Sequence, residues 1–445
     1  MSETTQNTSH DDYSLSRVPQ HAKKPLWQII VIRLGCFACV SQLMTGAALG
    51  FGMSFHDALL AVFLGSIALL IVGAAVGVIA AQQGLSTSLL ARWSGFGNQG
   101  SALIGVIIAI SSIGWFGMQN TVFAEGMYQA TGILNLQIWS VLTGASIIAI
   151  VYFGISSLSW TANIALPLFL VAIGISSIQM FRGHSLTDLI ASPIPGPALS
   201  LATGATMVAG SFIIGAVISP DICRFLKRGR DVFWMTLIST FVGELSMCML
   251  AVLMAHAIKS ADVMTIIVSL SGLIGVIIVI FSTIKVNDIN LYAASLGMTN
   301  ALNALFKKDF DRRQMTIILG VFGTALSVIG VINYFENFLV VLGVAIPPIA
   351  GIISIDYFIL KRDRKILDES KERGELPDKV ENWNPVAILA WAVGSLVGYF
   401  VQIGIPSINS LIVSGLLYYG AMKVYGLIQK KEIVRFRMVD SQSEG

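Results

Sequence analysis

The chain has 445 residues, of which 55% are hydrophobic and only 12% are charged. Soluble domains carry about 25% charged residues, so this composition excludes an ordinary water-soluble protein and predicts an integral membrane protein. The formal net charge of +3 is too small to indicate a nucleic-acid-binding protein.

The apolar runs predict one transmembrane domain between two polar tails. We expect residues 1–26 to be a disordered cytoplasmic tail, because no cleavable signal-peptide pattern precedes the first apolar run. Residues 27–430 contain repeated apolar runs of the roughly 20 residues that cross a bilayer, and residues 431–445 form a second cytoplasmic tail. The predicted spans are 27–52, 57–82, 98–128, 136–155, 159–180, 200–220, 232–258, 264–296, 314–333, 336–359, 384–403 and 406–428.

The basic residues predict the orientation of these spans. With the N-terminus in the cytoplasm, all but four of the 28 Lys and Arg residues fall in tails or loops on the cytoplasmic side. The exceptions are Arg33, Arg182, Lys259 and Lys285. Because cytoplasmic loops of membrane proteins are enriched in Lys and Arg, we expect both termini to be cytoplasmic and the protein to lie in the bacterial inner membrane.

Gly, Ser and Thr clusters interrupt two spans that are five apart in the chain. Span 1 contains LGCFACVSQLMTGAALGFG and span 6 contains ATGATMVAGSFIIGAVISP. Interrupted helices at corresponding points of two halves indicate a transporter whose binding site lies at the bilayer midplane. This spacing predicts two repeats of five helices and two additional helices.

Charged side chains inside spans are costly and are often functional. Lys285 lies deep in span 8, and Asp288 follows on the same helical face, so the two could pair. We favour a role for Lys285 in coupling or binding. Arg33 is closer to the cytoplasm and could snorkel, and Glu125 and Glu244 are expected to make hydrogen bonds between helices.

Aromatic and amide side chains in three spans suit a flat heterocyclic ligand. Trp115 and Gln119 lie one turn apart in span 3, Phe212 follows Ser211 in span 6, and Asn287 lies in span 8. Two rings could sandwich a heterocycle, since base–aromatic stacking contributes about 1–3 kcal/mol, while the amides supply donors and acceptors.

Several longer segments resemble the nucleobase:cation symporter-1 family, which includes the cytosine permeases. The resemblance extends over about residues 18–430. The segments are VPQHAKK (18–24), MTGAALGFGMSFHDALLAVFLGS (44–66), GLSTSLLARWSGFG (84–97), GWFG (114–117), GSFI (210–213), PDICRF (220–225), NDINLYAASLG (287–297) and AIPPIAGIISIDYF (345–358).

The resemblance implies an all-α integral membrane protein with the LeuT-like fold, which has 12 transmembrane helices as 5+5 inverted repeats plus 2. It also implies alternating access, with Trp115 and Phe212 stacking on the substrate and Ser211 and Asn287 nearby. Ser112 stands where cytosine permeases have a glutamine, whereas Gln119 resembles the arrangement of hydantoin-type relatives. The substrate is therefore expected among cytosine-like bases, purines, hydantoin and allantoin.

A second departure concerns the coupling ion. Lys285 stands where sodium-coupled relatives carry a hydroxyl ligand, and the same site uses backbone carbonyls around Gly35. An ammonium group there would repel Na⁺ by several kcal/mol. We therefore expect coupling to protons rather than sodium, or none, with Lys285, Asp288 and Gly35 as the coupling residues.

The same sequence features leave functions other than transport of a heterocycle to consider. A carrier of amino acids or other small organic solutes on the same scaffold is the alternative within transport. A membrane-embedded enzyme is disfavoured, because the sequence contains no HExxH motif or nucleotide-binding loop, and its histidines are scattered at His10, His21, His56, His184 and His256. We expect no cofactor, no bound metal and no nucleic-acid partner.

Overall fold

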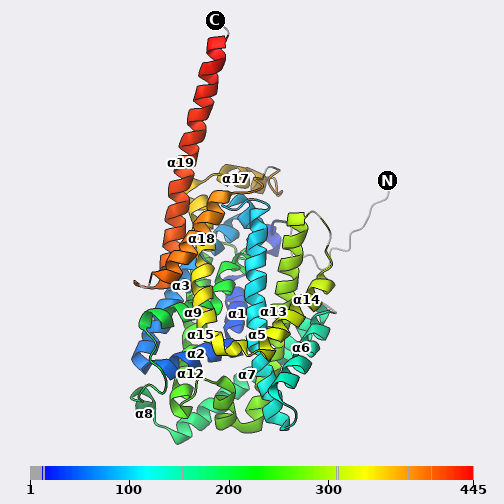
Figure 1. The fold of residues 1–445 in the computed structure, drawn as a ribbon, viewed down its shortest axis with the longest axis vertical. Helices are drawn as coiled ribbons and strands as arrows, with labels where there is room; N and C mark the ends of the chain where they lie inside the picture. Colours follow the sequence, from blue (N-terminus) through cyan, green and yellow to red (C-terminus); the bar gives the residue numbers. More distant parts are fainter. Residues whose placement is uncertain are drawn as a thin grey trace, which may run out of the picture.

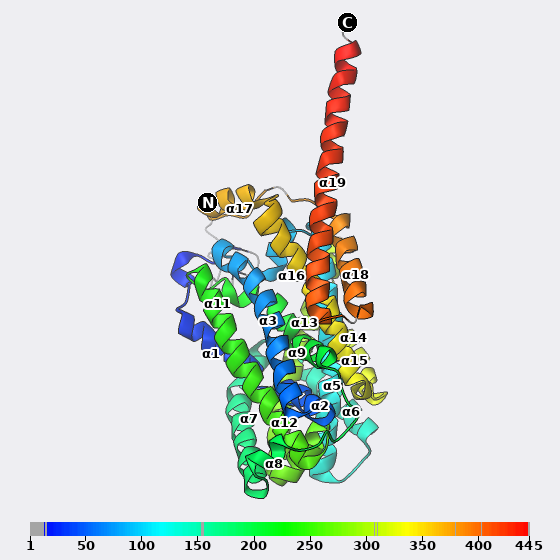
Figure 2. The same ribbon diagram turned by 90° about the vertical axis from the view of Figure 1, so that its left-hand side faces the viewer.

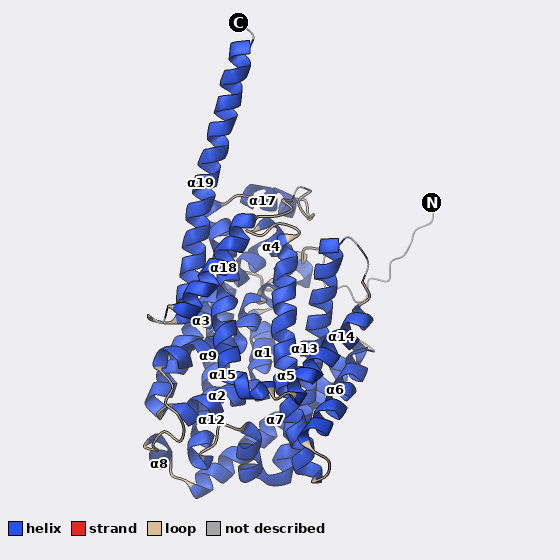
Figure 3. Cartoon of the chain, in the orientation of Figure 1, coloured by secondary structure: helices blue, strands red, loops and turns tan. Residues whose placement is uncertain are grey.

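In the computed structural model, the residues described are 13, 16–152, 155–306, 308, 310–378, 380–401 and 403–443. Regular structure within these ranges is entirely helical, as Figure 3 shows. Most long helices run along the long axis of the molecule (Figure 1). Helix α17 (Arg364–Glu372) and the far end of α19 (Pro406–Ser443) lie at one end of that axis, and α8 (Leu186–Ile190) lies at the other.

The helices follow one another with few long connections. The first half of the chain contains the 3-10 turn η1 (Gln20–Ala22), α1 (Leu26–Phe37), α2 (Val40–Gly52), α3 (Phe55–Gln83), α4 (Thr87–Trp93), α5 (Gly100–Thr131), α6 (Leu136–Tyr152), α7 (Ile155–Gly183), α8 and α9 (Leu201–Val217). The second half contains α10 (Pro220–Cys223), α11 (Gly229–Ile238), the π-helical turn η2 (Ser239–Glu244), α12 (Leu245–Ile258), α13 (Val263–Phe306), α14 (Arg312–Val328), the 3-10 turn η3 (Val331–Tyr334), α15 (Phe335–Ala345), α16 (Pro347–Ser354), the π-helical turn η4 (Ile355–Leu360), α17, α18 (Pro385–Phe400) and α19.

Several of these helices are long and apolar enough to cross a membrane. In the described residues, four continuous helices meet that requirement: Phe55–Gln83, Gly100–Thr131, Gly229–Ile258 and Val331–Leu360. Two bent pairs, Leu26–Phe37 with Val40–Gly52 and the two parts of α13, raise the number to six. Shorter apolar helices include α6, α9 and α18. The chain is therefore a multi-pass membrane protein, and the number of twelve spans stays a prediction.

The first span breaks where the sequence indicated. Helices α1 and α2 meet at an angle of 57°, and the break falls at Ala38 and Cys39. The amide of Cys39 donates to the carbonyl of Phe37 (2.9 Å) rather than to that of Gly35. The last carbonyls of α1 therefore leave the regular helical ladder, which places the negative end of a helix dipole inside the bundle.

The sixth span differs from the expectation. Helix α9 is continuous from Leu201 to Val217, and the interruption comes only after it, before the short α10. Glycines inside α9 serve close packing instead: a Cβ at Gly210 would collide with the backbone carbonyl of Leu339 on α15. The Gly-rich pattern was therefore a packing signal in this helix, and Pro220 starts the next one.

A close crossing of α5 and α13 positions the centre of the bundle. Gly105 and Gly297 face each other, and a Cβ at either residue would lie 3.1 Å from the carbonyl oxygen of the other. Helix α13 is bent by 70° between its parts Val263–Ile277 and Val279–Phe306. Gly272, in the first part, has a φ of 58° and a ψ of −151°, a conformation open to glycine. The two helices thus stay in contact along the segments that carry Trp115 and Asn287.

The N-terminal segment packs against the end of the bundle that carries α17. We expected residues 1–26 to form a disordered tail. Residues 1–12, 14 and 15 lie outside the described part, but Arg17 and Val18 are buried. The amide of Lys24 donates to the carbonyl of Phe225 (2.7 Å), in the loop after α10. Figure 2 shows α1 and α11 side by side at this end.

Two of the longer sequence segments meet at the same end. The backbone amide of Thr87, at the start of α4, donates to the carboxylate of Asp221 on α10 (2.8 Å). A carboxylate at a helix N-terminus satisfies an amide that lacks an intrahelical partner. The segments around 84–97 and 220–225 therefore support each other.

Candidate functional site

One face of α5 carries three of the predicted site residues. Ser112, Trp115 and Gln119 are spaced three and four residues apart, so their side chains lie on one face of the helix. All three are buried, with exposed fractions of 4%, 6% and 1%. The Oε1 atom of Gln119 has no hydrogen-bond partner among the described residues. A buried amide oxygen without a hydrogen bond destabilises the protein by about 1–3 kcal/mol. A hydrogen-bond donor of a ligand would remove this cost.

Asn287 on α13 makes a hydrogen bond to the same turn of α5. Its Nδ2 atom donates to the backbone carbonyl of Phe116 (3.2 Å), which lies between Trp115 and Gln119 in the chain. The side chain is fully buried, and its Oδ1 atom has no partner in the described part of the chain. Asn287 therefore contacts the α5 backbone between Trp115 and Gln119, and the side-chain oxygens of Gln119 and Asn287 both lack a partner among the described residues.

Two further aromatic rings border Trp115, and the sequence analysis missed both. The indole makes edge-to-face contacts with Phe335 (6.0 Å between ring centroids) and Phe338 (5.3 Å), both on α15. The segment YFENF contains these rings at the start of a span, but rings at that place are equally typical of a membrane-interface belt. Only the packing of α15 against α5 shows that they surround Trp115.

Phe212 and Ser211 on α9 already have partners. The ring of Phe212 stacks on Phe37 of α1, with centroids 4.0 Å apart and 28° between the planes. The hydroxyl of Ser211 donates to Val208 O (2.7 Å) and to Glu244 Oε1 (3.0 Å). In this conformation the two expected rings, Trp115 and Phe212, therefore contact different neighbours, and Phe37 covers one face of Phe212.

Arg33 is buried and does not snorkel. Its side chain is only 3% exposed, and Nη2 donates to Ser219 Oγ (3.1 Å). The guanidinium carbon lies 4.8 Å from the ring centroid of Phe212, within the range of a cation–π contact. Arg33 thus ties α1 to the end of α9 next to an expected binding residue.

The predicted coupling residues lie on α13 and α1. Lys285 is half-buried, whereas Asp288 is fully buried. Among the ion pairs within 4.0 Å that the structure shows for the described residues, none involves Lys285; a pairing of Lys285 with Asp288 stays a prediction. Gly35 lies in the last turn of α1, next to the break at Ala38.

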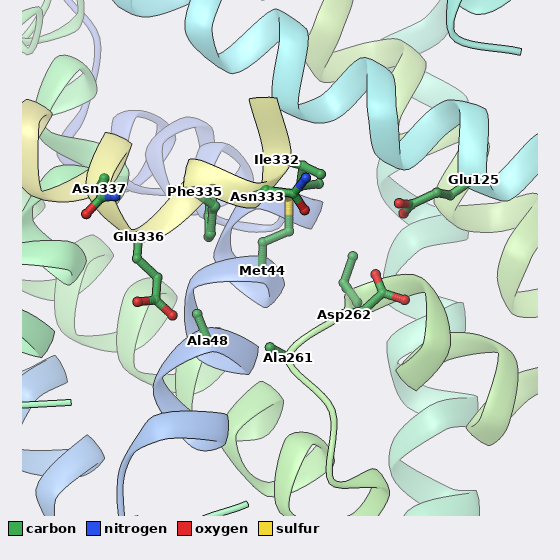
Figure 4. A pocket seen from close by; sticks show the side chains of 11 residues that line it. Met44, Ala48, Glu125, Ala261, Asp262, Ile332, Asn333, Phe335, Glu336 and Asn337 are labelled. Carbon is green, nitrogen blue, oxygen red and sulfur yellow. The ribbon is translucent and has the colours of Figure 1, made fainter. Parts of the chain in front are cut away.

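A cavity of about 450 Å³ opens between α2, α5, α15 and the loop before α13 (Figure 4). Its polar lining consists of Glu125, Asp262, Asn333, Glu336 and Asn337. Phe335 lines the cavity and also contacts Trp115, so the cavity ends at the aromatic cluster. No group of three His, Cys, Asp or Glu side chains arranged to hold a metal ion occurs within the described ranges.

Solved structures resemble this fold closely. Mhp1, a nucleobase-cation-symport-1 family transporter, matches in a closed conformation with bromovinylhydantoin bound, with a TM-score of 0.70 and 21% identity over 92% of this chain and 94% of that one. Its inward-facing conformation matches with a TM-score of 0.75 and 20% identity over 93% and 94% of the two chains. The expected LeuT-like transporter fold is confirmed.

Sequence relatives cover nearly the whole chain. The cytosine permease of Escherichia coli (strain K12) is 30% identical over 409 residues, which are 92% of this chain and 93% of that protein. The hydantoin permease of Microbacterium maritypicum is 24% identical over 370 residues, 76% of this chain and 74% of that protein. Residues 17–420 match the family described as permease for cytosine/purines, uracil, thiamine, allantoin. The chain belongs to this family of permeases, and it is a membrane transporter rather than an enzyme.

Proposed function

We propose that this transporter imports a nucleobase or a related small heterocycle by alternating access, as a secondary active carrier. One observation carries the proposal. The hydrogen bond from Asn287 to the carbonyl of Phe116 sets an amide beside Trp115 and Gln119. A buried aromatic surface with two unpaired amide oxygens matches a flat ring that carries N–H donors at its edge.

The proposed substrate-binding residues are Trp115, Gln119 and Asn287, with Ser112 on the same face of α5. Phe212 and Ser211 border the site from α9, and Phe212 becomes available when Phe37 moves away from it. Phe335 and Phe338 belong to the same aromatic cluster. The cavity beside Phe335 supplies the route by which the substrate reaches this cluster.

We further propose that sodium does not drive transport. Lys285 carries its ammonium group without an ion-pair partner among the described residues, and a cation close to it would be repelled. The last carbonyls of α1, including that of Gly35, are the backbone part of the proposed coupling site.

The proposed orientation in the membrane follows from the basic residues at the end of the molecule that carries α17. Helix α17 lies at the end of the molecule toward which α19 extends (Figure 1), and the N-terminal segment packs on α17 through Arg17. Residues 17–24, 360–383 and 423–437 together carry 15 of the 28 Lys and Arg residues. The positive-inside rule assigns this end to the cytoplasm. The cavity beside Phe335 then opens toward the periplasm of a bacterial inner membrane.

The test is uptake of labelled cytosine into cells that lack their own nucleobase permeases, with and without sodium. Unlabelled uracil, purines, hydantoin, allantoin and amino acids serve as competitors. Uptake that is independent of Na⁺ and inhibited by heterocycles supports the proposal. Inhibition by amino acids alone supports the alternative solute carrier, and a strict sodium requirement refutes the role of Lys285.

A further inference from the structure

A carboxylate lies at the meeting point of three helices, outside the proposed binding face of α5. Glu244 ends the π-helical turn η2 and immediately precedes α12, and it is fully buried. Its Oε1 atom accepts a hydrogen bond from Ser211 Oγ on α9 (3.0 Å) and a weak one from Cys248 Sγ on α12 (3.6 Å). A π-helical turn inside a long helix often marks a functional position.

The third partner is Gln42 on α2. Its amide faces the carboxylate and can present either of its two atoms. With the nitrogen toward Glu244, Nε2 lies 2.9 Å from Oε1 and 3.2 Å from Oε2, so it donates to the ionised carboxylate. A half-turn of the amide would direct Oε1 of Gln42 to Glu244, where it would accept the proton of a neutral carboxylic acid. One rotation of the amide therefore matches each protonation state.

No basic side chain of the described neighbouring helices pairs with the carboxylate of Glu244. No ion pair within 4.0 Å involves Glu244 in the described part of the chain. Arg33 on α1 is directed to Ser219 and the ring of Phe212. The other titratable groups that face it are the thiols of Cys248 and of Cys39, and the contact from α3 to η2 is made by Phe63 against Phe241. Burial of an unpaired carboxylate penalises its charged form.

The partners of Glu244 lie beside the break in the first span and beside Phe212. Gln42 follows the break between α1 and α2 by three residues, and Ser211 directly precedes Phe212. We propose that Glu244 is a proton-binding site of the transport cycle, and that Gln42 and Ser211 transmit its occupancy to α2 and α9. The proposal rests on the transport function above, and it names a proton-binding group in addition to Lys285.

The proton balance is simple. A proton from water on one side of the membrane forms an O–H bond with a carboxylate oxygen of Glu244, which changes from −1 to neutral. Gln42 turns its oxygen to accept this O–H, and it no longer donates to the carboxylate. Release to the other side breaks the O–H bond and restores the anion, which again accepts from Gln42 Nε2.

The first experiment does not need a substrate. Infrared difference spectra of the purified protein between acidic and neutral pH are expected to contain the C=O stretching band of a protonated carboxylic acid. Glu244→Gln is expected to lose this band. Gln42→Met and Ser211→Ala keep the carboxyl group but remove a hydrogen-bond partner, so each is expected to shift the band. An unchanged band in all three variants overturns the proposal.

The second experiment measures transport in proteoliposomes with labelled cytosine. For one proton per substrate, a gradient of one pH unit corresponds to about tenfold accumulation. In Glu244→Gln, which mimics the protonated form, accumulation is expected to fall to the level reached without a gradient, while exchange of labelled for unlabelled cytosine continues. Accumulation that still follows the proton gradient in this variant overturns the proposal.

The matched control is Asp57→Asn, which removes an exposed carboxylate from the first turn of α3. Both its infrared band and its pH-dependent accumulation are expected to equal those of the wild type. The infrared and transport experiments test the role of Glu244 and the proposed substrate separately. If the wild type carries no cytosine, the proposed substrate is wrong, and the infrared band still decides the role of Glu244.

Discussion

Arg17 binds Gln83 at the end of the bundle that carries α17. Its Nη1 atom donates to both the backbone oxygen (2.5 Å) and the side-chain Oε1 (3.0 Å) of Gln83, the last residue of α3. Nη2 donates to Leu367 O (3.0 Å) and Ser370 Oγ (2.7 Å) on α17. Burial lowers the pKa of Arg17 to about 10, which still leaves the guanidinium charged at neutral pH. One side chain thus fastens the N-terminal segment, α3 and α17 together.

Replacement of Arg17 is expected to loosen this end of the protein. Arg17→Ala removes charged hydrogen bonds to several buried acceptors, which costs about 2–4 kcal/mol. Arg17→Lys is not expected to restore them, because an ammonium group cannot reproduce the planar fork of donors. The measurement is protease cleavage within residues 360–383 in inside-out vesicles. Cleavage equal to that of the wild type in both variants would show that the clamp does not hold α17.

Gln119→Leu is expected to weaken substrate binding more than it alters folding. The change keeps the volume but removes the amide whose Oε1 is unpaired in the described structure, and loss of a buried hydrogen bond costs about 1–3 kcal/mol, or roughly five- to 150-fold in apparent affinity. Uptake at varied substrate concentration measures the effect. Ser111→Ala is the control, because its hydroxyl bonds only Ile107 O (2.8 Å) within its own helix. A similar loss in both variants would point to a general packing defect.

Lys285→Thr is expected to make uptake responsive to sodium. The substitution removes the fixed positive charge and supplies a hydroxyl oxygen, which is a suitable ligand for a hard cation. The measurement is the ratio of uptake with sodium to uptake with potassium. Lys259→Thr, at the left-handed C-cap of α12, serves as the control and is expected to remain indifferent to sodium. A ratio of one in Lys285→Thr would leave the lysine without a role in ion selection.

Gly297→Val is expected to separate α13 from α5. A Cβ at this position lies 3.1 Å from the carbonyl oxygen of Gly105, so alanine requires a small adjustment and valine a larger one, with a cost of about 1–3 kcal/mol from overpacking. Because Asn287 bonds the α5 backbone, the separation should also reduce uptake. Thermal stability in detergent and uptake should both decrease from glycine to alanine to valine. Equal behaviour of the three would show that the crossing tolerates side chains.

The sequence predicted some contacts and missed others for identifiable reasons. The helical face with Trp115 and Gln119 was predictable, because spacing within one helix fixes which side chains share a face. The neighbours of Trp115 on α15 were not, since more than 200 residues separate Phe335 from it and no periodicity relates two distant helices. Ser211 was expected to face the substrate, but its hydroxyl donates a hydrogen bond to Glu244. Only the packing of α9 against η2 shows this contact.

By itself, the sequence determined that the protein lies in a lipid bilayer, that its fold is all-α and which family it belongs to. It also determined the orientation that we expect. Hydropathy, charge and motifs are properties of local segments, so they can be read without the tertiary structure. Tertiary structure decided which polar groups meet. The glycines of α9 became packing contacts instead of a break, Arg17 became a clamp, and Gln42 became the partner of Glu244. The physical reason is that a buried polar side chain must find its partner wherever the bundle brings one, and that choice depends on the packing of helices far apart in the chain.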